Sequence, residues 1–509
     1  MEYSQVFQAF SSLESGPAVL AAGAVVLAYY LISTVVSWYK LRHIRGPFLA
    51  SITNLWLSRL VWTGQICDTL GEEQKKYGQV MRVGPNAISV YDPETLIHMH
   101  KARSTYPKAP WYDGIRMDWR GHSVLSEPDT ILHDKRKAKL AKGFAVGGPK
   151  NLEKKIDSWI GALVVRIREK ITNGEAVMDI GLLVQYFQVD LITEAGLGKA
   201  WGDLADDRDH YEYLAMNNTV LPFIHSFCYI PLLRGLLTST WLMKLVGPKT
   251  TDKNGLGLFL GLLEKETESR FDGRTQKLKE GGTDMLSEWL RHGLSAQEAQ
   301  LDLALQVPAG TETSATAIRG LLLAIMSSPT TYIRLKQEIK DAIEAGRISD
   351  PITNDEAKGL VYLQAAIKET LRVMSPVVAG FPKQVPESGD TIGGVFVPGG
   401  TEVHANFHLL MRNPEIFGED VDIFRPERFL GSDPAIPQMV KTVDLIFGTG
   451  RFMCLGKGFA LMELNKIFVQ LLRNFDFQMA DPERPWKRTR RLTVYINDFW
   501  VKVSEAGLE

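Results

Sequence analysis

One uncharged apolar segment constrains this chain more than any other feature. From Gly16 to Tyr39 the sequence contains no charged residue and includes the run AVLAAGAVVLAYYLISTVV. A helix of about 20 apolar residues is long enough to cross a bilayer. The alternative is a buried core helix, but such helices seldom run this long without a charge at one extreme of a chain. The segment therefore predicts a transmembrane anchor at residues 16–39.

The charges on either side of this segment predict its orientation. Only acidic residues, Glu2 and Glu14, precede it, whereas Lys40, Arg42 and Arg45 follow it directly. A cleaved signal peptide has a positive region first and a shorter apolar run, so we expect the segment to be retained. The positive-inside rule then places residues 1–15 in the lumen as a short N-terminus and most of the chain in the cytoplasm.

Two further expectations depend on that orientation. Residues 40–47, which end in Gly46-Pro47, are predicted to form a basic hinge linker between the anchor and the globular body. The glycosylation sequon Asn217-Asn218-Thr219 is expected to stay unmodified, because it never enters the lumen.

Charge and cysteine content exclude several classes of protein. The 509 residues carry a formal net charge of −1 without a long tract of one sign, so no nucleic-acid partner is expected. The three cysteines, Cys67, Cys228 and Cys454, form no CxxC pair. This argues against a disulfide framework and against a zinc site built from thiolates.

Sequence patterns predict a mainly helical fold with small sheets. Apolar residues on both sides of Gly84-Pro85-Asn86 predict a β-hairpin over 80–90. Residues from about 150 to 345 have helical periodicity and few prolines. Glycines among β-branched residues over 388–403 predict a second small sheet, followed by a loop-rich stretch to about residue 456.

The run FGTGRFMCLGK, from Phe447 to Lys457, carries the strongest chemical signal. Its glycines at 448, 450 and 456 permit tight turns and the close approach of a flat ligand. Cys454 directly precedes a predicted helix, whose positive end and N–H donors favour a thiolate. A lone cysteine is more often a small buried hydrophobe, but the glycine pattern favours a metal ligand or a nucleophile here.

This run resembles the haem loop of the cytochrome P450 superfamily, F-x-x-G-x-R-x-C-x-G. It departs from that pattern at one position, because Phe452 replaces the arginine that contacts a haem propionate, and Arg451 lies one residue early. Three more family motifs occur in the expected order: AGTETS from Ala309, KETLR from Lys368 and FRPERF from Phe424. The residues of these motifs are most similar to those of fungal microsomal members of the family that act in secondary metabolism.

The resemblance implies a fold, a cofactor and a reaction. The fold is the mainly α cytochrome P450 fold with small β-sheets, with residues 48–509 forming a single haem-thiolate monooxygenase domain behind the anchor. The cofactor is haem b, and the reaction inserts one atom of O2 into an apolar small molecule. Electrons are expected from NADPH through NADPH-cytochrome P450 reductase, because the chain has no flavin or nicotinamide fingerprint. The implied location is the endoplasmic reticulum membrane, crossed once.

The resemblance also implies which residues hold the haem. Cys454 is the expected axial ligand of the iron, and a thiolate in that place favours O–O cleavage. The other expected cofactor-binding residues surround the loop or face the propionates: Phe447, Gly448, Gly450, Arg451, Gly456, His133, Lys137 and Lys383. The basic run Lys135, Arg136, Lys137, Lys139 and Lys142 is a candidate docking surface for an acidic flavoprotein, although such runs are more often a solvated face.

The long helix that carries AGTETS is predicted to contain the proton relay. Ser295 and Glu298 form a capping box, which predicts a helix from there to about Met326. Pro308 is expected to kink or widen it. By the resemblance, Gly310 leaves room for O2 while Glu312 and Thr313 relay protons. The alternative is that the threonine only bonds back to the carbonyl four residues earlier.

Two further groups are carried over from the family. Glu369 and Arg372 are expected to join Arg428 in a buried charge triad that braces the haem loop. Substrate-facing candidates are mostly apolar, and each is equally compatible with the core: Trp111, Tyr112, Ile115, Met117, Leu221, Phe223, Ala309, Thr313, Val377, Val378, Ala379 and Ile496.

Two other functions stay open. An oxygen-independent haem-thiolate isomerase or dehydratase shares the fold, but Glu312 and Thr313 argue against it. A membrane-anchored haem sensor or carrier needs neither a relay nor a substrate pocket. The substrate and the position oxidised depend on pocket shape, which the sequence does not determine.

Overall fold

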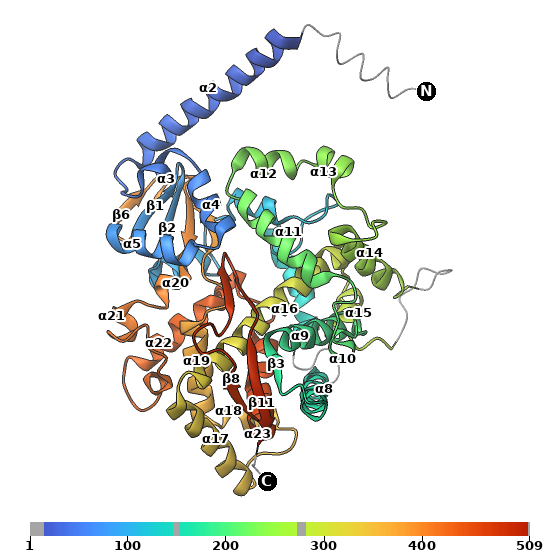
Figure 1. The fold of residues 1–509 in the computed structure, drawn as a ribbon. Helices are drawn as coiled ribbons and strands as arrows, with labels where there is room; N and C mark the ends of the chain where they lie inside the picture. Colours follow the sequence, from blue (N-terminus) through green and yellow to red (C-terminus); the bar gives the residue numbers. More distant parts are fainter. Residues whose placement is uncertain (1–14, 146–151, 272–280, 507–509) are drawn as a thin grey trace.

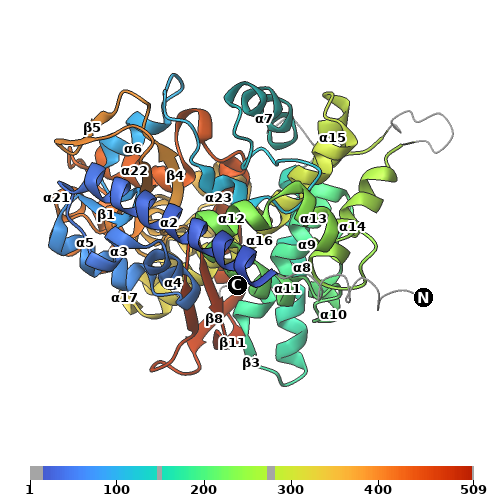
Figure 2. The same ribbon diagram turned by 90° about the horizontal axis from the view of Figure 1, so that it is seen from above.

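A computed structural model describes residues 15–145, 152–271 and 281–506. The fold is mainly α with small sheets, as predicted (Figure 1). Helices α8, α9, α11, α14 and α15 lie on one side, and most of the strands lie on the other (Figure 2). Of the residues predicted to lie in the lumen, residues 1–14 are outside the described part of the chain.

The helices follow the chain with these bounds: α2 (Ser15–Leu41), α3 (Phe48–Ile52), α4 (Leu55–Thr63), η1 (Ile66–Leu70), α5 (Gly71–Tyr77), α6 (Pro93–His100), η2 (Pro110–Ile115), α7 (Thr130–Phe144), α8 (Leu152–Thr172), α9 (Ile180–Leu197), α10 (Asp203–Asp206), α11 (Tyr213–Phe227), α12 (Pro231–Leu237), α13 (Thr240–Val246), α14 (Gly255–Glu268), α15 (Met285–Arg291), α16 (Ala296–Met326), α17 (Pro329–Glu344), α18 (Asn354–Lys358), α19 (Val361–Val373), α20 (Phe407–Leu410), α21 (Pro414–Phe417), η3 (Pro426–Phe429), α22 (Ile436–Asp444), η4 (Leu445–Phe447), η5 (Gly450–Phe452) and α23 (Lys457–Asn474). The strands are β1 (Val80–Gly84), β2 (Ala87–Val90), β3 (Val177–Asp179), β4 (Gly380–Gln384), β5 (Asp390–Ile392), β6 (Val395–Val397), β7 (Glu402–Ala405), β8 (Phe475–Met479), β9 (Lys487–Arg490), β10 (Val494–Asn497) and β11 (Trp500–Glu505).

Helix α2 contains the apolar segment and projects away from the body (Figure 1). Among the described residues, its part from Gly23 to Leu41 is the one stretch of helix long and apolar enough to cross a membrane. The following residues pack against the body, because Leu41 and Ile44 are buried and Arg82 N–H donates to the Arg45 carbonyl at 2.9 Å. The segment predicted as a hinge is therefore held against β1.

The largest sheet of the described residues has the order β1-β2-β7-β4. The predicted hairpin over 80–90 is confirmed, since β1 and β2 are antiparallel with Val80 opposite Val90. The prediction of a separate sheet over 388–403 is only half right. Strands β5 and β6 form their own hairpin, but β7 joins the first sheet beside β2. Sequence pattern alone does not show which distant strand a short strand pairs with.

Helix α16 crosses the middle of the molecule (Figure 1). Its predicted capping box is present, with Ser295 and Glu298 each bonded to the other's backbone, and the helix ends at Met326 as expected. It packs against α9, a helix buried on nearly every side, and against α23. The site is built between these helices and the first sheet.

Candidate functional site

The cysteine loop is a tight turn between η4 and α23. Cys454 N–H donates to the Phe447 carbonyl at 2.6 Å, which closes the loop. Gly450 has a φ of 56°, and a Cβ there would lie 2.3 Å from the His100 carbonyl oxygen. A side chain at this position is therefore excluded by strain and by contact. Cys67 and Cys228 are buried, whereas Cys454 is exposed.

Several groups shift the pKa of the Cys454 thiol, and they do so in opposite directions. Although Cys454 is exposed at one side, the surrounding chain desolvates its sulfur, and this raises the pKa of the thiol. The backbone N–H groups of Gly456 and Lys457, which bond to the sulfur, and the charges of Lys137 and Lys457 lower that pKa but do not outweigh burial. Coordination of a metal ion would favour the thiolate form of Cys454.

The basic residues predicted around the loop are mostly engaged with the chain itself. Lys137 Nζ donates to the carbonyls of Arg451 and Met453, both at 2.6 Å, and Arg451 Nε lies 3.0 Å from Asp134 Oδ2. His133 Nδ1 pairs with the other oxygen of Asp134 at 2.9 Å. Lys137 and Arg451 thus tie α7 to the loop.

The basic run of α7 is also less available than its sequence indicates. Arg136 is buried, with Nε 2.5 Å from Asp302, and Lys139 donates to the Gly293 carbonyl at 2.6 Å. Of the run, Lys135 and Lys142 remain exposed. The expectation of a five-residue docking surface is therefore wrong for Arg136, which is a core ion pair.

The ring of Phe452 lies in a cluster of cations. Lys383 Nζ is 2.9 Å and Lys108 Nζ 5.5 Å from the ring centroid, and the His133 ring is 5.0 Å away. Lys383 is fully buried, and within the described part of the chain its Nζ has no hydrogen-bond partner. Burial, with smaller contributions from the charges of Lys108 and Arg451, lowers the pKa of Lys383 to about 6.

Sequence reasoning found Lys383 and His133 but missed Lys108. Lys108 and Lys383 pair as an isolated antiparallel bridge between segments 275 positions apart (383 − 108), so they meet through the fold. Lys108 Nζ donates to the carbonyls of Val124 and Leu125 at 2.9 and 2.7 Å. Burial lowers its pKa to about 7. No sequence signal marked this residue.

One face of α16 is open although the helix is central. Ala309 is exposed and Thr313, one turn later, is half-buried, while most of their neighbours are buried. Thr313 Oγ1 donates to the Ala309 carbonyl at 2.8 Å, which is the back-bonded state considered from the sequence. A Cβ on Gly310 would lie 2.7 Å from Ile192 Cδ1 of α9. Close packing of α9 against α16 therefore disfavours a side chain at position 310.

Glu312 is buried and turned toward α9. One carboxylate oxygen accepts from Gln185 Nε2 at 3.2 Å, and the other lies 3.6 Å from Arg319 Nη1. Burial raises the pKa of Glu312, partly offset by the charge of Arg319. A polar cavity of about 200 Å³ lies beside it, lined also by Asp179, Asn217, Asn218 and Asp498. Glu312 thus lies between α16 and a cavity that water can enter.

The charge triad forms as a fully buried cluster. Arg372 donates to both oxygens of Glu369 at 2.8 Å, and Arg428 Nε lies 3.0 and 3.1 Å from the same two oxygens. The arginines also donate to backbone carbonyls, including those of Met411 and Ile423. These contacts hold the segment from 411 to 423, which precedes the cysteine loop in the chain.

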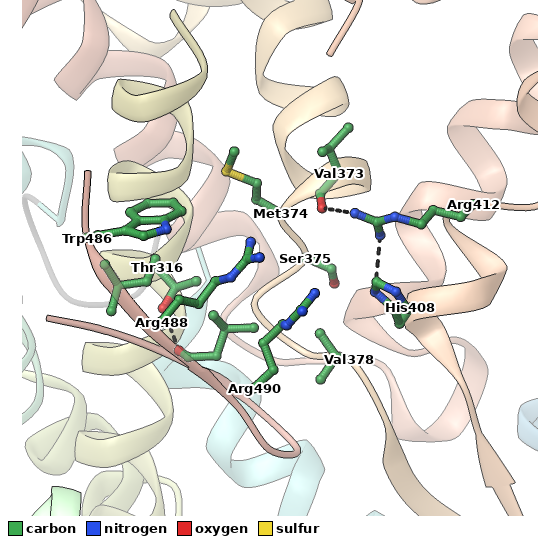
Figure 3. Close-up of a pocket in the computed structure, with 12 residues that line it drawn as sticks. Thr316, Val373, Met374, Ser375, Val378, His408, Arg412, Trp486, Arg488 and Arg490 are labelled. Carbon is green, nitrogen blue, oxygen red and sulfur yellow. Dashed lines mark hydrogen bonds between the residues drawn. The ribbon is translucent and has the colours of Figure 1, made fainter. Parts of the chain in front are cut away.

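The substrate candidates divide by burial. Trp111 is buried in an aromatic cluster with Tyr112, Tyr229 and Phe381 at ring separations of 5.2 to 6.2 Å, which favours a core role. Tyr112, Val378, Ala379 and Ile496 are also buried, Ile115, Met117, Leu221 and Val377 are half-buried, and Phe223 is exposed. Of these, Val378 and Ile496 line a small cavity beside β9 (Figure 3).

Comparisons with known proteins agree with this geometry. The family model described as Cytochrome P450 matches residues 46–499. The cytochrome P450 monooxygenase ABA1 of Pyricularia oryzae is 35% identical over 499 residues, which cover 95% of this chain and 96% of that protein. The cytochrome P450 monooxygenase aba1 of Botryotinia fuckeliana is 35% identical over 92% of both chains. The cytochrome P450 monooxygenase cicH of Emericella nidulans is 28% identical over 94% of this chain and 98% of that protein.

Proposed function

Because this chain belongs to the cytochrome P450 family and is a monooxygenase, we propose that it inserts one atom of O2 into an apolar small molecule with haem b held at Cys454. The observation that carries the proposal is the loop of Cys454, which exposes a sulfur with N–H donors beside it. We further propose that the reaction is a step of fungal secondary-metabolite biosynthesis, in line with the resemblance of its motifs.

The residues present fit a haem. The group needs one ligand for its iron and counter-ions for two carboxylates. Cys454 offers the ligand, while the buried Nζ of Lys383 and the nearby Nζ of Lys108 are basic groups without a carboxylate partner in the described chain, and a haem carboxylate beside them would favour their charged forms. His133 and Phe452 complete this end of the site. When bound, the haem supplies dioxygen activation, which a thiolate ligand favours over reversible binding.

We assign proton transfer to Glu312 and Thr313. The raised pKa of Glu312 keeps a proton on its carboxyl group near neutral pH more often than an exposed glutamate does. The polar cavity beside it supplies water to replace that proton. Thr313 holds its hydroxyl proton on the Ala309 carbonyl and must rotate to donate it elsewhere. This arrangement suits a general acid that is recharged from solvent.

We propose that α2 anchors the enzyme in the endoplasmic reticulum membrane, with residues 1–15 in the lumen and the catalytic domain, residues 48–509, in the cytoplasm. Support comes from a second apolar surface on the same side of the body as α2 (Figure 1). It consists of exposed side chains on α12 and α13: Leu232, Leu233, Leu236, Trp241, Leu245 and Val246. Exposed apolar patches of this kind mark contact with another apolar phase.

Electrons are proposed to come from NADPH through NADPH-cytochrome P450 reductase. The chain offers exposed basic residues for such a partner at Lys135 and Lys142 of α7, the helix whose Lys137 bonds to the loop that carries Cys454. Exposed charges of this kind act chiefly on the rate of encounter and are sensitive to salt.

The first test is the visible spectrum of the reduced, carbon-monoxide-bound protein. A Soret band strongly red-shifted from that of histidine-ligated haem is expected for the wild type and for the control Cys67→Ala, which removes a buried cysteine. Cys454→Ala is expected to lose this band. An unchanged spectrum in Cys454→Ala contradicts thiolate ligation by Cys454, and with it the monooxygenase proposal.

A further inference from the structure

A cluster of arginines lies between the β9–β10 hairpin and the linker from α19 to β4. Arg412, Arg488 and Arg490 surround a cavity of about 20 Å³, with His408 beside them (Figure 3). The hairpin contributes Arg488 and Arg490, and the segment after α20 contributes Arg412. Three guanidinium groups thus meet from two parts of the fold.

Acidic residues do not balance these charges inside the cluster. Arg412 Nε lies 3.0 Å from Asp422, and Arg490 pairs with Asp68. Both carboxylates are largely exposed, at 78% and 63% of their side-chain surfaces, so solvent screens them. The Arg488 side chain makes neither a hydrogen bond nor an ion pair in the described part of the chain, and its guanidinium lies 6.0 Å from the centroid of the Trp486 ring. Of the three arginines, Arg488 is therefore the one without a carboxylate partner among the described residues.

The neutral groups beside the arginines do not supply a negative charge. His408 Nδ1 is 3.2 Å from Arg412 Nη1, so it accepts that N–H and the ring carries its proton on Nε2. Burial and the three arginines lower the pKa of His408 to about 2. Burial raises the pKa of Cys67, which lies near the same arginines, to about 12, so its thiol stays protonated. Lys75, farther off, adds positive charge.

The size of the cavity limits what can balance this charge. A volume of about 20 Å³ on this measure holds one water-sized species, for which roughly 10–15 Å³ suffices. A phosphate or sulfate has too many atoms for it. A water molecule fits but leaves the charge in place, whereas a halide fits and accepts charge-assisted hydrogen bonds from guanidinium N–H groups. The Arg488 side chain reaches solvent, which provides a way in.

We propose that this cavity binds a single chloride ion through Arg412, Arg488 and Arg490. The ion joins the β9–β10 hairpin to the segment after α20, and these two segments otherwise present like charges to each other. Val378 of the α19–β4 linker and Ile496 of the hairpin, two of the substrate-facing candidates, line the same cavity. The bound ion therefore sets the spacing of two walls next to the proposed substrate pocket. The site is independent of haem ligation.

Chloride-35 NMR line broadening on the full-length haem protein tests the site. The wild type is expected to broaden the chloride signal, and bromide is expected to reverse the broadening by competition, whereas gluconate is too large for the cavity. Arg488→Gln removes a charged donor and is expected to weaken binding about tenfold or more. Arg484→Gln is the matched control, because Arg484 is 86% exposed and pairs only with Asp481. It is expected to bind as the wild type does.

A second measurement does not need a variant. Wild-type crystals grown in bromide are expected to show an anomalous peak between Arg412 and Arg488. A peak elsewhere only, or water alone in the cavity, overturns the proposal, as does equal broadening by Arg488→Gln and Arg484→Gln. A peak at crystal concentrations together with no competition by bromide at about 150 mM salt also overturns it, because the site is then empty under ordinary conditions. The red-shifted Soret band is expected in all three proteins, so failure here is distinct from failure of the haem assignment.

Discussion

Two buried charge clusters in this protein differ in whether the chain completes them. In the triad, Glu369 receives hydrogen bonds from Arg372 and Arg428, and the arginines also reach backbone carbonyls. In the cluster at Phe452, Lys383 is equally buried, but its Nζ lacks a partner within the described residues and Lys108 adds a like charge. A closed cluster stabilises the fold. An open one indicates a ligand that brings the missing charge.

The largest expected effect comes from opening the closed cluster. Glu369→Gln leaves buried Arg372 without a carboxylate and leaves Arg428 only its pair with Asp420, which is expected to cost about 3–5 kcal/mol of unfolding free energy. Urea unfolding and the yield of carbon-monoxide-binding protein measure the loss. Glu72→Gln is the control, because Glu72 forms an exposed pair with Lys75 at 3.1 Å and its loss is expected to cost below about 0.5 kcal/mol. Equal stability of the two variants contradicts the structural role of the triad.

Replacing Lys383 is expected to have smaller effects, which differ in sign between the stability of the haem-free chain and the retention of haem. Lys383→Met removes a buried amino group without a hydrogen-bond partner in the described chain, so the haem-free chain is expected to gain about 1–3 kcal/mol of stability. The same change removes a counter-ion for the haem carboxylates, so haem transfer to an excess of apomyoglobin is expected to accelerate about tenfold, which corresponds to about 1.4 kcal/mol.

Lys358→Met, at an exposed pair with Asp355, is the control for both measurements. If Lys383→Met lowers the stability of the haem-free chain as well as haem retention, Lys383 belongs with the triad as a structural residue, and the distinction between the two clusters fails.

A third buried group, Glu463, is expected to make the free energy of unfolding depend on pH. Glu463 on α23 is bonded by Gln188 and Ser314 but by no cation among the described residues, and burial raises its pKa to about 8. The folded state therefore binds this proton more tightly than the unfolded state, whose glutamate pKa is about 4.3. The stabilisation is complete below about pH 4 and is lost as pH rises through about 8, with a slope of at most about 1.4 kcal/mol per pH unit.

Glu463→Gln is expected to flatten this slope, because an amide does not titrate. Unfolding free energies from urea titrations between about pH 5 and pH 9 measure it. Glu344→Gln, at an exposed site on α17, should keep the wild-type slope. If both variants keep it, the acid that controls the pH dependence lies elsewhere.

Local patterns in the sequence predicted the elements that local chemistry determines. The capping box of Ser295, the hairpin at Gly84 and the apolar helix before Leu41 each depend on neighbours within a few residues. The turn before Cys454 was predicted for the same reason, because only glycine fits at 450. The triad and the relay residues came from the family resemblance, since spacing alone does not show that Glu369 meets Arg428.

Contacts between distant segments were not predictable in this way. The bridge that brings Lys108 to Lys383 depends on how two chain segments pair in the finished fold. Gly310 shows the same limit, because its sequence context does not show that Ile192 of α9 packs against it. The direction of Glu312, toward Arg319 and Gln185, also depends on the packing of α9.

The open cation cluster at Phe452 makes the lifetime of this protein depend on how much iron its cell has for haem. A ligand that binds only the folded state raises the folded fraction in proportion to its free concentration. Chains that unfold are removed by proteases, so small changes in stability alter abundance several-fold. With the buried Lys383 amino group lacking a hydrogen-bond partner in the described chain, the chain waiting for haem is the more vulnerable form. Iron starvation is therefore expected to shorten the lifetime of this protein even when its messenger RNA is unchanged.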